Sequence, residues 1–180
     1  MAAALIQIKR KRAWTAYRFA MNPDLRKFIF RILGQHRILT IATNRADGWP
    51  QATTVAYVNE GLTLYCFIAR VSQKYANIKH DPRVSIAIAH DFNSPENIEG
   101  LSMAALAEYI DDKRVFDRIL NLFLTRCPEF SSWGRPNPAF SPLVRLLPEI
   151  ISVLDYSKSF GHSDLIKVSA ADLRAEPIAI

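Results

Sequence analysis

Short β-rich runs separated by turn residues constrain the fold of this chain more than any other feature. Ile, Leu, Val and Thr, which favour strands, are frequent in four of these runs. The four runs are residues 37–43, 51–58, 62–69 and 83–89. Asp47-Gly48 and Asn59-Glu60-Gly61 lie between them, and such residues are typical of hairpin turns. This order predicts an antiparallel sheet built from consecutive hairpins.

Two longer segments have helical periodicity and are expected to flank the sheet. The first extends from Asn22 to about Gln35, with Asn22 as a good N-cap and Pro23 at the first helical position. The second follows Asp111, its expected cap, and ends near Arg126. Further strands are expected near residues 101–110, 150–156 and 164–168. The proline-rich residues 131–142 are expected to form an ordered loop or a segment that faces a partner, not a helix. The chain is therefore predicted to be mainly β, an antiparallel barrel with flanking helices.

Composition excludes several classes of protein. The chain has 180 residues, 49% of them hydrophobic, which suits one globular domain with a sizeable core. No apolar run approaches the ~20 residues that span a bilayer, and the N-terminus lacks the apolar core of a secretory signal. Cys66 and Cys127 are expected to be buried and reduced, and no Cys/His spacing suggests a metal site. We therefore expect a cytoplasmic protein with no metal and no membrane partner.

Much of the net charge of +6 lies in Lys9–Arg12, near the start of the chain. A basic run of this kind can contact nucleic acid or an acidic surface. No aromatic stacking platform accompanies it, so a solvated terminus is the favoured interpretation and a nucleic-acid partner is not expected. We treat residues 1–21 as a basic extension and residues 22–180 as a single domain.

The segment from Ser72 to Val84 carries the clearest functional signal. It predicts a short helix that begins after Ser72 and stops near His80, because Pro82 disfavours helix at the residue before it. The first turn would present unpaired N–H groups, a hydroxyl and the Lys74 ammonium, which together favour a bound phosphate. The alternative is a simple N-cap next to a solvated lysine.

With this segment and its neighbours, the chain resembles the FMN-binding split-barrel family that includes pyridoxamine 5'-phosphate oxidase. The matching features are Gly-x-Pro before a strand and Ser-x-Lys-x-x-Asn-x-x-x-Asp-Pro-Arg-Val after a hairpin. The matching segments are residues 38–43, 47–51, 53–57 and 72–84. The resemblance implies a split β-barrel that binds FMN between two subunits, and therefore a homodimer.

The same resemblance implies which residues would bind the flavin. Ser72 and Lys74 would bind its phosphate, with Arg70 assisting, whereas Gln73 stands where the oxidase has a second basic residue. Two strands would lie against the ring and the ribityl chain. The residues implied on these strands are Thr53, Thr54, Val55, Phe67, Ile68 and Ala69. Ordinary strand surface is the alternative role of the first three, and barrel core that of the last three.

A second candidate segment lies around Gly161, close to the C-terminus. It combines aromatic, cationic and titratable side chains on one turn, and it resembles a segment of some split-barrel relatives of unassigned function. The residues predicted to face a substrate are Tyr156, Lys158, Phe160 and His162. A polar hairpin loop is the alternative. The basic C-terminal arrangement with which the oxidase grips its substrate phosphate is not found, so oxidation of pyridoxamine phosphate is not expected.

These features favour an FMN-binding oxidoreductase of unassigned substrate. The partners would be a small molecule or a nicotinamide electron donor, and no catalytic side chain is assigned because flavin carries the chemistry. One alternative is a non-catalytic flavin-binding or sensor protein. Others are a split barrel that binds a deazaflavin, or haem with His162 or His90 as axial ligand, and a barrel that binds nucleic acid through Lys9–Arg12.

Overall fold

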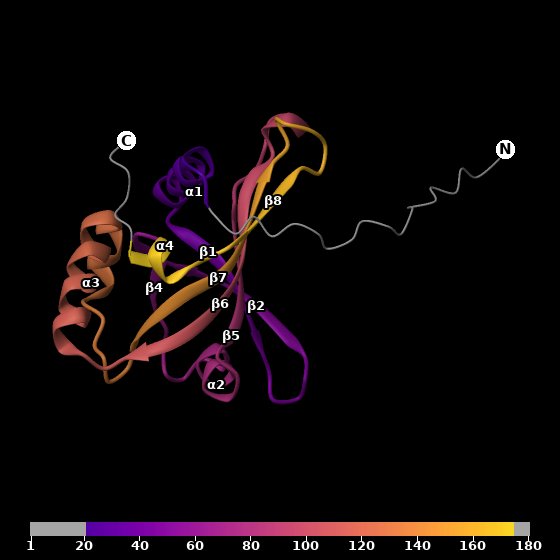
Figure 1. Ribbon diagram of the computed structural model, residues 1–180. Helices are drawn as coiled ribbons and strands as arrows, with labels where there is room; N and C mark the ends of the chain where they lie inside the picture. The colour runs from indigo at the N-terminus through magenta and orange to yellow at the C-terminus, as the bar shows by residue number, and fades with distance from the viewer. Residues whose placement is uncertain (1–20, 175–180) are drawn as a thin grey trace.

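A single antiparallel sheet, curled into a half-barrel, forms the centre of the molecule (Figure 1). The computed structural model describes residues 21–174, so Lys9–Arg12 lies outside the described residues. The strands are β1 (Ile38–Asn44), β2 (Pro50–Ala56), β3 (Val58–Glu60), β4 (Thr63–Phe67), β5 (Arg83–Ala89), β6 (Glu99–Ile110), β7 (Leu143–Asp155) and β8 (Ser163–Lys167). Their order is β2-β1-β5-β6-β7-β4-β3, and β8 pairs with β7. The predicted split barrel with flanking helices is confirmed.

Helices lie around this sheet. They are α1 (Pro23–Gln35), α2 (Gln73–His80), α3 (Lys113–Arg126), α4 (Ala170–Arg174) and two 3₁₀ helices, η1 (Pro95–Asn97) and η2 (Pro128–Trp133). Of the three expected helices, α1 and α2 begin at the expected caps and α3 does not. Asn22 caps α1 by accepting a hydrogen bond from the N–H of Leu25 at 2.8 Å. Asp111 does not cap α3, because Asp112 accepts from the N–H of Arg114 at 2.7 Å instead. None of the described helices is long and apolar enough to cross a membrane.

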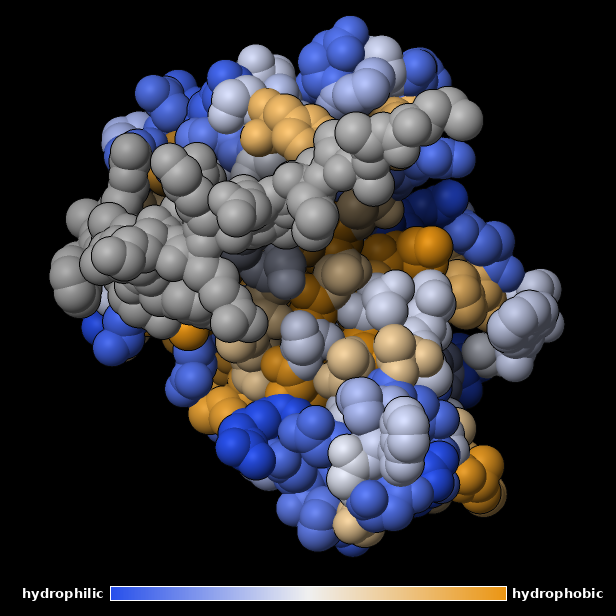
Figure 2. Space-filling model, turned by 90° about the vertical axis from the view of Figure 1, so that its right-hand side faces the viewer, coloured by the Kyte–Doolittle hydropathy of each residue, from blue (hydrophilic) through white to orange (hydrophobic). Residues whose placement is uncertain are grey.

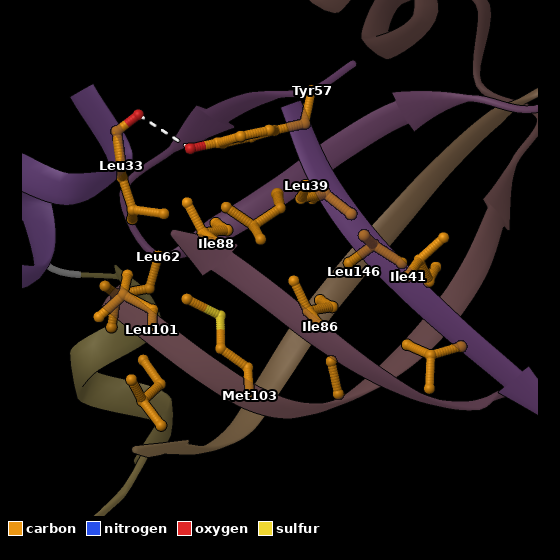
Figure 3. Close-up of a cluster of buried hydrophobic side chains, with 14 of the residues drawn as sticks. Leu33, Leu39, Ile41, Tyr57, Leu62, Ile86, Ile88, Leu101, Met103 and Leu146 are labelled. Atoms are coloured by element: carbon orange, nitrogen blue, oxygen red, sulfur yellow. Dashed lines mark hydrogen bonds between the residues drawn. The ribbon is translucent and has the colours of Figure 1, made fainter. Parts of the chain in front are cut away.

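The connection between β2 and β3 joins the two edges of the open sheet. A single strand over residues 51–58 is predicted, but β2 ends at Ala56 and β3 begins at Val58, which pairs with β4. Tyr57 between them is fully buried, and its hydroxyl donates to the Leu33 carbonyl of α1 at 3.1 Å (Figure 3). The chain therefore leaves one edge of the sheet at β2 and enters the opposite edge at β3.

Strand β7 is longer than predicted, because a proline does not interrupt it. The sequence predicts a strand from about residue 150, yet the strand begins well before Pro148. The register with β6 shifts between Ala104 and Ala105, which leaves Glu149 as an extra residue in a bulge. A bulge tolerates proline because it interrupts the ladder of hydrogen bonds locally. One long strand can therefore pair with β6 on one side and with both β4 and β8 on the other.

Two hydrophobic cores hold these elements together. The larger fills the concave side of the sheet beneath α1 and includes Ile41, Ile86 and Met103 (Figure 3). The smaller lies beneath α3 around Phe116. Each core contains one of the two free cysteines. Burial raises the pKa of Cys66 to about 12, so its thiol is neutral and inert at physiological pH.

Candidate functional site

A buried asparagine holds α2 against the sheet. Asn77 is 1% exposed, and its Nδ2 donates to Thr43 Oγ1 on β1 at 2.9 Å and to Gln51 Oε1 on β2 at 3.1 Å. Its Oδ1 accepts from Gln73 Nε2 at 2.9 Å. A buried amide is tolerated only when it is hydrogen-bonded, so these contacts set where the helix begins relative to β1 and β2. The asparagine of the Ser-x-Lys-x-x-Asn pattern is therefore structural.

We expect Asn77→Ala to lower the free energy of unfolding by about 2–3 kcal/mol, because it removes three hydrogen bonds and leaves buried partners unsatisfied. Urea denaturation measures this. Asn44→Ala is the matched control, since the Asn44 amide donates at 2.9 Å to the exposed side of Asp81. The control should lose less than about 1 kcal/mol. Equal losses in the two variants would contradict the structural role assigned to Asn77.

The start of α2 has the predicted cap and an unpaired cation. Ser72 Oγ accepts from the N–H of Tyr75 at 3.4 Å and donates to the Ala69 carbonyl at 2.7 Å. Lys74 is half-buried and forms no ion pair with any described residue. Its positive charge opposes the rise that burial causes in the pKa of the Cys66 thiol. This end of the helix therefore combines free N–H groups with an unneutralised charge.

The two faces of β2 separate the strand residues predicted to contact a flavin. Gln51, Thr53 and Val55 alternate along one face, and the contact between Gln51 and Asn77 shows that this face is turned towards α2. Thr53 Oγ1 is buried and has no hydrogen-bond partner in the described part of the chain. Thr54 lies on the opposite, exposed face. The structure thus brings Thr53 and Val55 towards α2, but not the side chain of Thr54.

Strand β2 also presents a free edge. The N–H of Tyr57 donates to the Arg37 carbonyl at 2.9 Å, which sets the side of the chain that faces β1. Backbone groups alternate in direction along an antiparallel strand, so those of Thr54 and Ala56 point away from β1. Within residues 21–174, β2 pairs with no strand other than β1, which leaves these donors and acceptors available to a ligand.

A cleft of about 550 Å³ lies between the ends of β2 and β4 and the segment after α3, and we call it the strand-end cleft. Its size is within the usual range of ligand sites. Its strand side is Val55, Ala56, Phe67 and Ala69, and its other side includes Phe123, Phe130, Trp133, Arg135 and Phe140. The Phe67 ring meets the ring of Phe123 edge to face, with centroids 5.3 Å apart. An aromatic, largely apolar lining of this kind suits a planar ring.

Of the ten residues predicted to bind the flavin, three line this cleft, namely Val55, Phe67 and Ala69, and the other seven do not. Ile68 is 1% exposed and belongs to the larger core, the alternative role given above. Arg70 donates to the hydroxyl of Tyr75 at 2.7 Å and to the Pro138 carbonyl at 3.2 Å. Its backbone N–H donates to the Phe140 carbonyl at 2.8 Å. These bonds tie the segment after η2 to the end of β4 and so form one wall of the strand-end cleft.

That wall is what the sequence interpretation missed. Residues 131–142 were expected to form a loop, but Ser131, Ser132 and Trp133 continue the 3₁₀ helix η2. Trp133 is 86% exposed and Phe140 is 74% exposed at the rim of the cleft. The exposed aromatic residues were the available signal, since large apolar side chains on a surface commonly mark a site of interaction.

The substrate-facing candidates lie far from the strand-end cleft within one chain. Tyr156, Lys158, Phe160 and His162 occupy the turn between β7 and β8, at the opposite end of the molecule from α2 (Figure 1). β4 meets β7 at its first residues, and the turn follows the last residue of this 13-residue strand. A rise of ~3.3 Å per residue makes the separation on the order of 40 Å. A role at this cleft therefore requires the turn of a second chain.

The four candidate side chains already have partners within the turn. Asp164 accepts from His162 Nε2 at 3.0 Å and lies 3.1 Å from Lys158 Nζ. The rings of Tyr156 and Phe160 meet edge to face. The substrate-facing role of this turn stays a prediction.

Comparison with known proteins places these features in a family. The family model described as pyridoxamine 5'-phosphate oxidase matches residues 25–140, more than half of the chain. The chain belongs to the pyridoxamine 5'-phosphate oxidase family. The matched residues include α2 and every residue that lines the strand-end cleft except Ser141. The resemblance seen in the sequence is confirmed.

Solved structures share this fold. A Listeria innocua protein named after pyridoxamine 5'-phosphate oxidase is 25% identical, with a TM-score of 0.58, and the match covers 72% of this chain and 98% of that one. HutZ, the heme storage protein from Vibrio cholerae, is 20% identical, with a TM-score of 0.59 and coverage of 67% and 87%. A heme binding protein from Mycobacterium smegmatis is 19% identical, with a TM-score of 0.68 and coverage of 82% and 60%. No curated protein matches the sequence.

Proposed function

We propose that this protein binds FMN, with the flavin ring in the strand-end cleft and the phosphate at the start of α2, and acts as an oxidoreductase. The observation that best supports this function is a set of unsatisfied polar groups around one site. The Thr53 hydroxyl is buried without a partner, and the Lys74 ammonium is half-buried without an ion pair among the described residues. Thr53 lies on the same face of β2 as Val55, which lines the strand-end cleft, and Lys74 lies in the first turn of α2, which Asn77 holds against β1 and β2.

Each group has a distinct role in this arrangement. Lys74, Ser72 and the first N–H groups of α2 would bind the phosphate. Gln73 supplies no second cation there, because its side chain is a neutral amide. This amide donates to Asn77. The β2 edge would hydrogen-bond the polar edge of the ring, and the aromatic residues of the cleft would exclude water. Bound FMN would supply the electron transfer, so the protein has only to position a small substrate or a nicotinamide donor.

A second copy of the chain is part of this proposal. Figure 2 shows apolar and weakly polar residues across the middle of the side that faces away from α3, with hydrophilic residues above and below. Most of the exposed residues of β5 and β6 are small, as Ala87, Ala89 and Ala104 illustrate, whereas Arg83 and Glu108 lie nearer the ends of these strands. A sheet face with small residues permits close packing of a second sheet. Sedimentation velocity tests the dimer.

The absorption spectrum of the purified protein, with and without added FMN, tests the function. Two flavin bands and quenched flavin fluorescence are expected. A colourless protein that takes up no FMN contradicts the proposal, and a shifted single band would indicate a deazaflavin. Oxidation of NADH or NADPH by the FMN-bound protein then separates an oxidoreductase from a non-catalytic flavin-binding or sensor protein. Two free buried thiols suit the cytoplasmic location that we propose.

Haem is the second candidate ligand, because two proteins of similar fold are named for heme storage or binding. No histidine lines the strand-end cleft. His162 is bound to Asp164, and the ring of His90 stacks on that of His36 with centroids 5.3 Å apart. Haem would therefore bind elsewhere on the chain. A Soret band that disappears in His162→Ala or His90→Ala would favour haem over FMN.

A further inference from the structure

A second cleft of about 570 Å³ lies next to the strand-end cleft. The two clefts share Arg135, Pro136 and Asn137, so the segment after η2 forms a wall of both. The rest of the second cleft comes from the first half of α3, from the residues before it and from Arg70. We call it the α3 cleft. It lies outside the arrangement proposed above for FMN.

Two arginines on the α3 cleft have only neutral partners. Arg70 donates to the Tyr75 hydroxyl and to a backbone carbonyl, and Arg135 donates to Asn121 Oδ1 at 3.3 Å. Neither guanidinium forms an ion pair with a described residue. Elsewhere in the described structure, arginines such as Arg31 and Arg83 lie 2.7 Å from carboxylates. The α3 cleft therefore holds two guanidinium groups whose charge is not neutralised locally.

The remaining charges on this cleft do not cancel those two. Lys113 and Asp117, one turn apart on α3, pair with each other at 2.5 Å. Asp111 is the other carboxylate on the lining, and it forms no ion pair with a described residue. The cleft thus offers an excess of positive charge beside a single unpaired carboxylate. Guanidinium groups bind carboxylates and phosphates well because their N–H groups match the oxygens of these anions.

The rest of the α3 cleft is apolar. Its lining includes Ile110, Phe116, Leu120, Pro136, Pro138 and Pro142. An apolar surface beside a few charged groups is the usual composition of a small-molecule site. We propose that the α3 cleft binds a small organic anion, in which a carboxylate or phosphate group is attached to an apolar body the size of one aromatic ring. Arg70 and Arg135 bind the anionic group, and Phe116 and Leu120 contact the ring.

Isothermal titration calorimetry with phenyl phosphate, benzoate and benzyl alcohol tests this site. The three probes share a ring, and only the first two carry a negative charge. Both anions should bind at least tenfold more tightly than the alcohol. Tighter binding of phenyl phosphate would identify phosphate as the preferred group, and tighter binding of benzoate would identify carboxylate. Absent binding of both anions, or equal binding of the neutral alcohol, overturns the proposal.

Arg135→Gln should weaken binding of the anionic probes about tenfold, since one guanidinium contact is lost. Arg114→Gln is the matched control, because Arg114 is exposed on α3 and does not line the cleft. Melting temperatures verify that both variants are folded. An equal loss of affinity in both variants would show that general charge attraction, rather than the α3 cleft, binds the probes, and the proposal would fail.

Repeating the titrations with FMN present separates this site from the flavin site. Binding of phenyl phosphate should persist at saturating FMN. Displacement by FMN would place the probe at the start of α2 and overturn the α3 cleft as an anion site. Persistent anion binding in a protein that takes up no FMN would instead refute only the flavin function. The two proposals therefore fail in distinguishable ways.

Discussion

Lys74→Ala is expected to weaken FMN binding about ten- to a hundredfold. Lys74 is half-buried at the start of α2 and has no carboxylate partner among the described residues. Its ammonium would make a charge-assisted hydrogen bond to the FMN phosphate, and such a bond contributes about 1.5–3 kcal/mol. A titration that follows the quenching of flavin fluorescence measures the change in the dissociation constant.

Lys79→Ala is the matched control for this variant. Lys79 lies in the last turn of the same helix, is exposed, and its ammonium lies 5.6 Å from the centroid of the Tyr75 ring. Its removal changes the net charge equally and should leave the dissociation constant within about twofold, since the charge of an exposed lysine is screened by solvent. Unchanged affinity in Lys74→Ala would place the phosphate away from α2.

Arg126→Met is expected to lower the free energy of unfolding by about 2–4 kcal/mol, the largest stability effect of the variants considered. Arg126 projects from the last turn of α3 to the carboxyl end of α1, which has no basic residue of its own in its last turn. Its guanidinium donates to the carbonyls of Leu33, Gly34 and His36, the last at 2.6 Å. The carbonyls of Gly34 and His36 lose their donor when Arg126 is removed, and that of Leu33 keeps only the Tyr57 hydroxyl.

Arg118→Met provides the comparison for this variant. Arg118 lies on the same helix and pairs at 3.0 Å with Glu60 on the surface. Exposed ion pairs contribute about 0–1 kcal/mol, so this variant should unfold at nearly the urea concentration of the parent. Urea denaturation of both variants tests the difference. The two free energies are comparable if the dependence of the unfolding free energy on urea concentration is unchanged. If Arg126→Met unfolds together with Arg118→Met, the guanidinium does not cap α1.

Much of the fold could be predicted because its signals are local. Asn22 before Pro23, and Ser72 before α2, are caps that act within four residues. Strand β5 matches its predicted range because Pro82 precedes it and alternating apolar residues define its buried face. The candidate phosphate site was predicted for the same reason, since a capped helix start and a lysine in its first turn lie within one short segment.

Other features depend on contacts between residues distant in sequence. The position of Pro148 in a bulge requires β6 as a partner, and the wall formed by Arg70 requires residues almost seventy positions away. Nothing local distinguishes Thr53, with its buried hydroxyl, from its exposed neighbour Thr54. A shift of one residue along a strand would exchange their faces.

The sequence by itself determined most of the elements and the capped start of α2, because caps, turns and alternation act over a few residues. The tertiary structure alone decided that the chain leaves the sheet at the buried Tyr57, between β2 and β3, and that Asn77 places α2 against β1 and β2. It also placed Arg135 between two clefts and the turn around Gly161 far from both. These arrangements come from packing and from buried hydrogen bonds between segments, which no local pattern encodes.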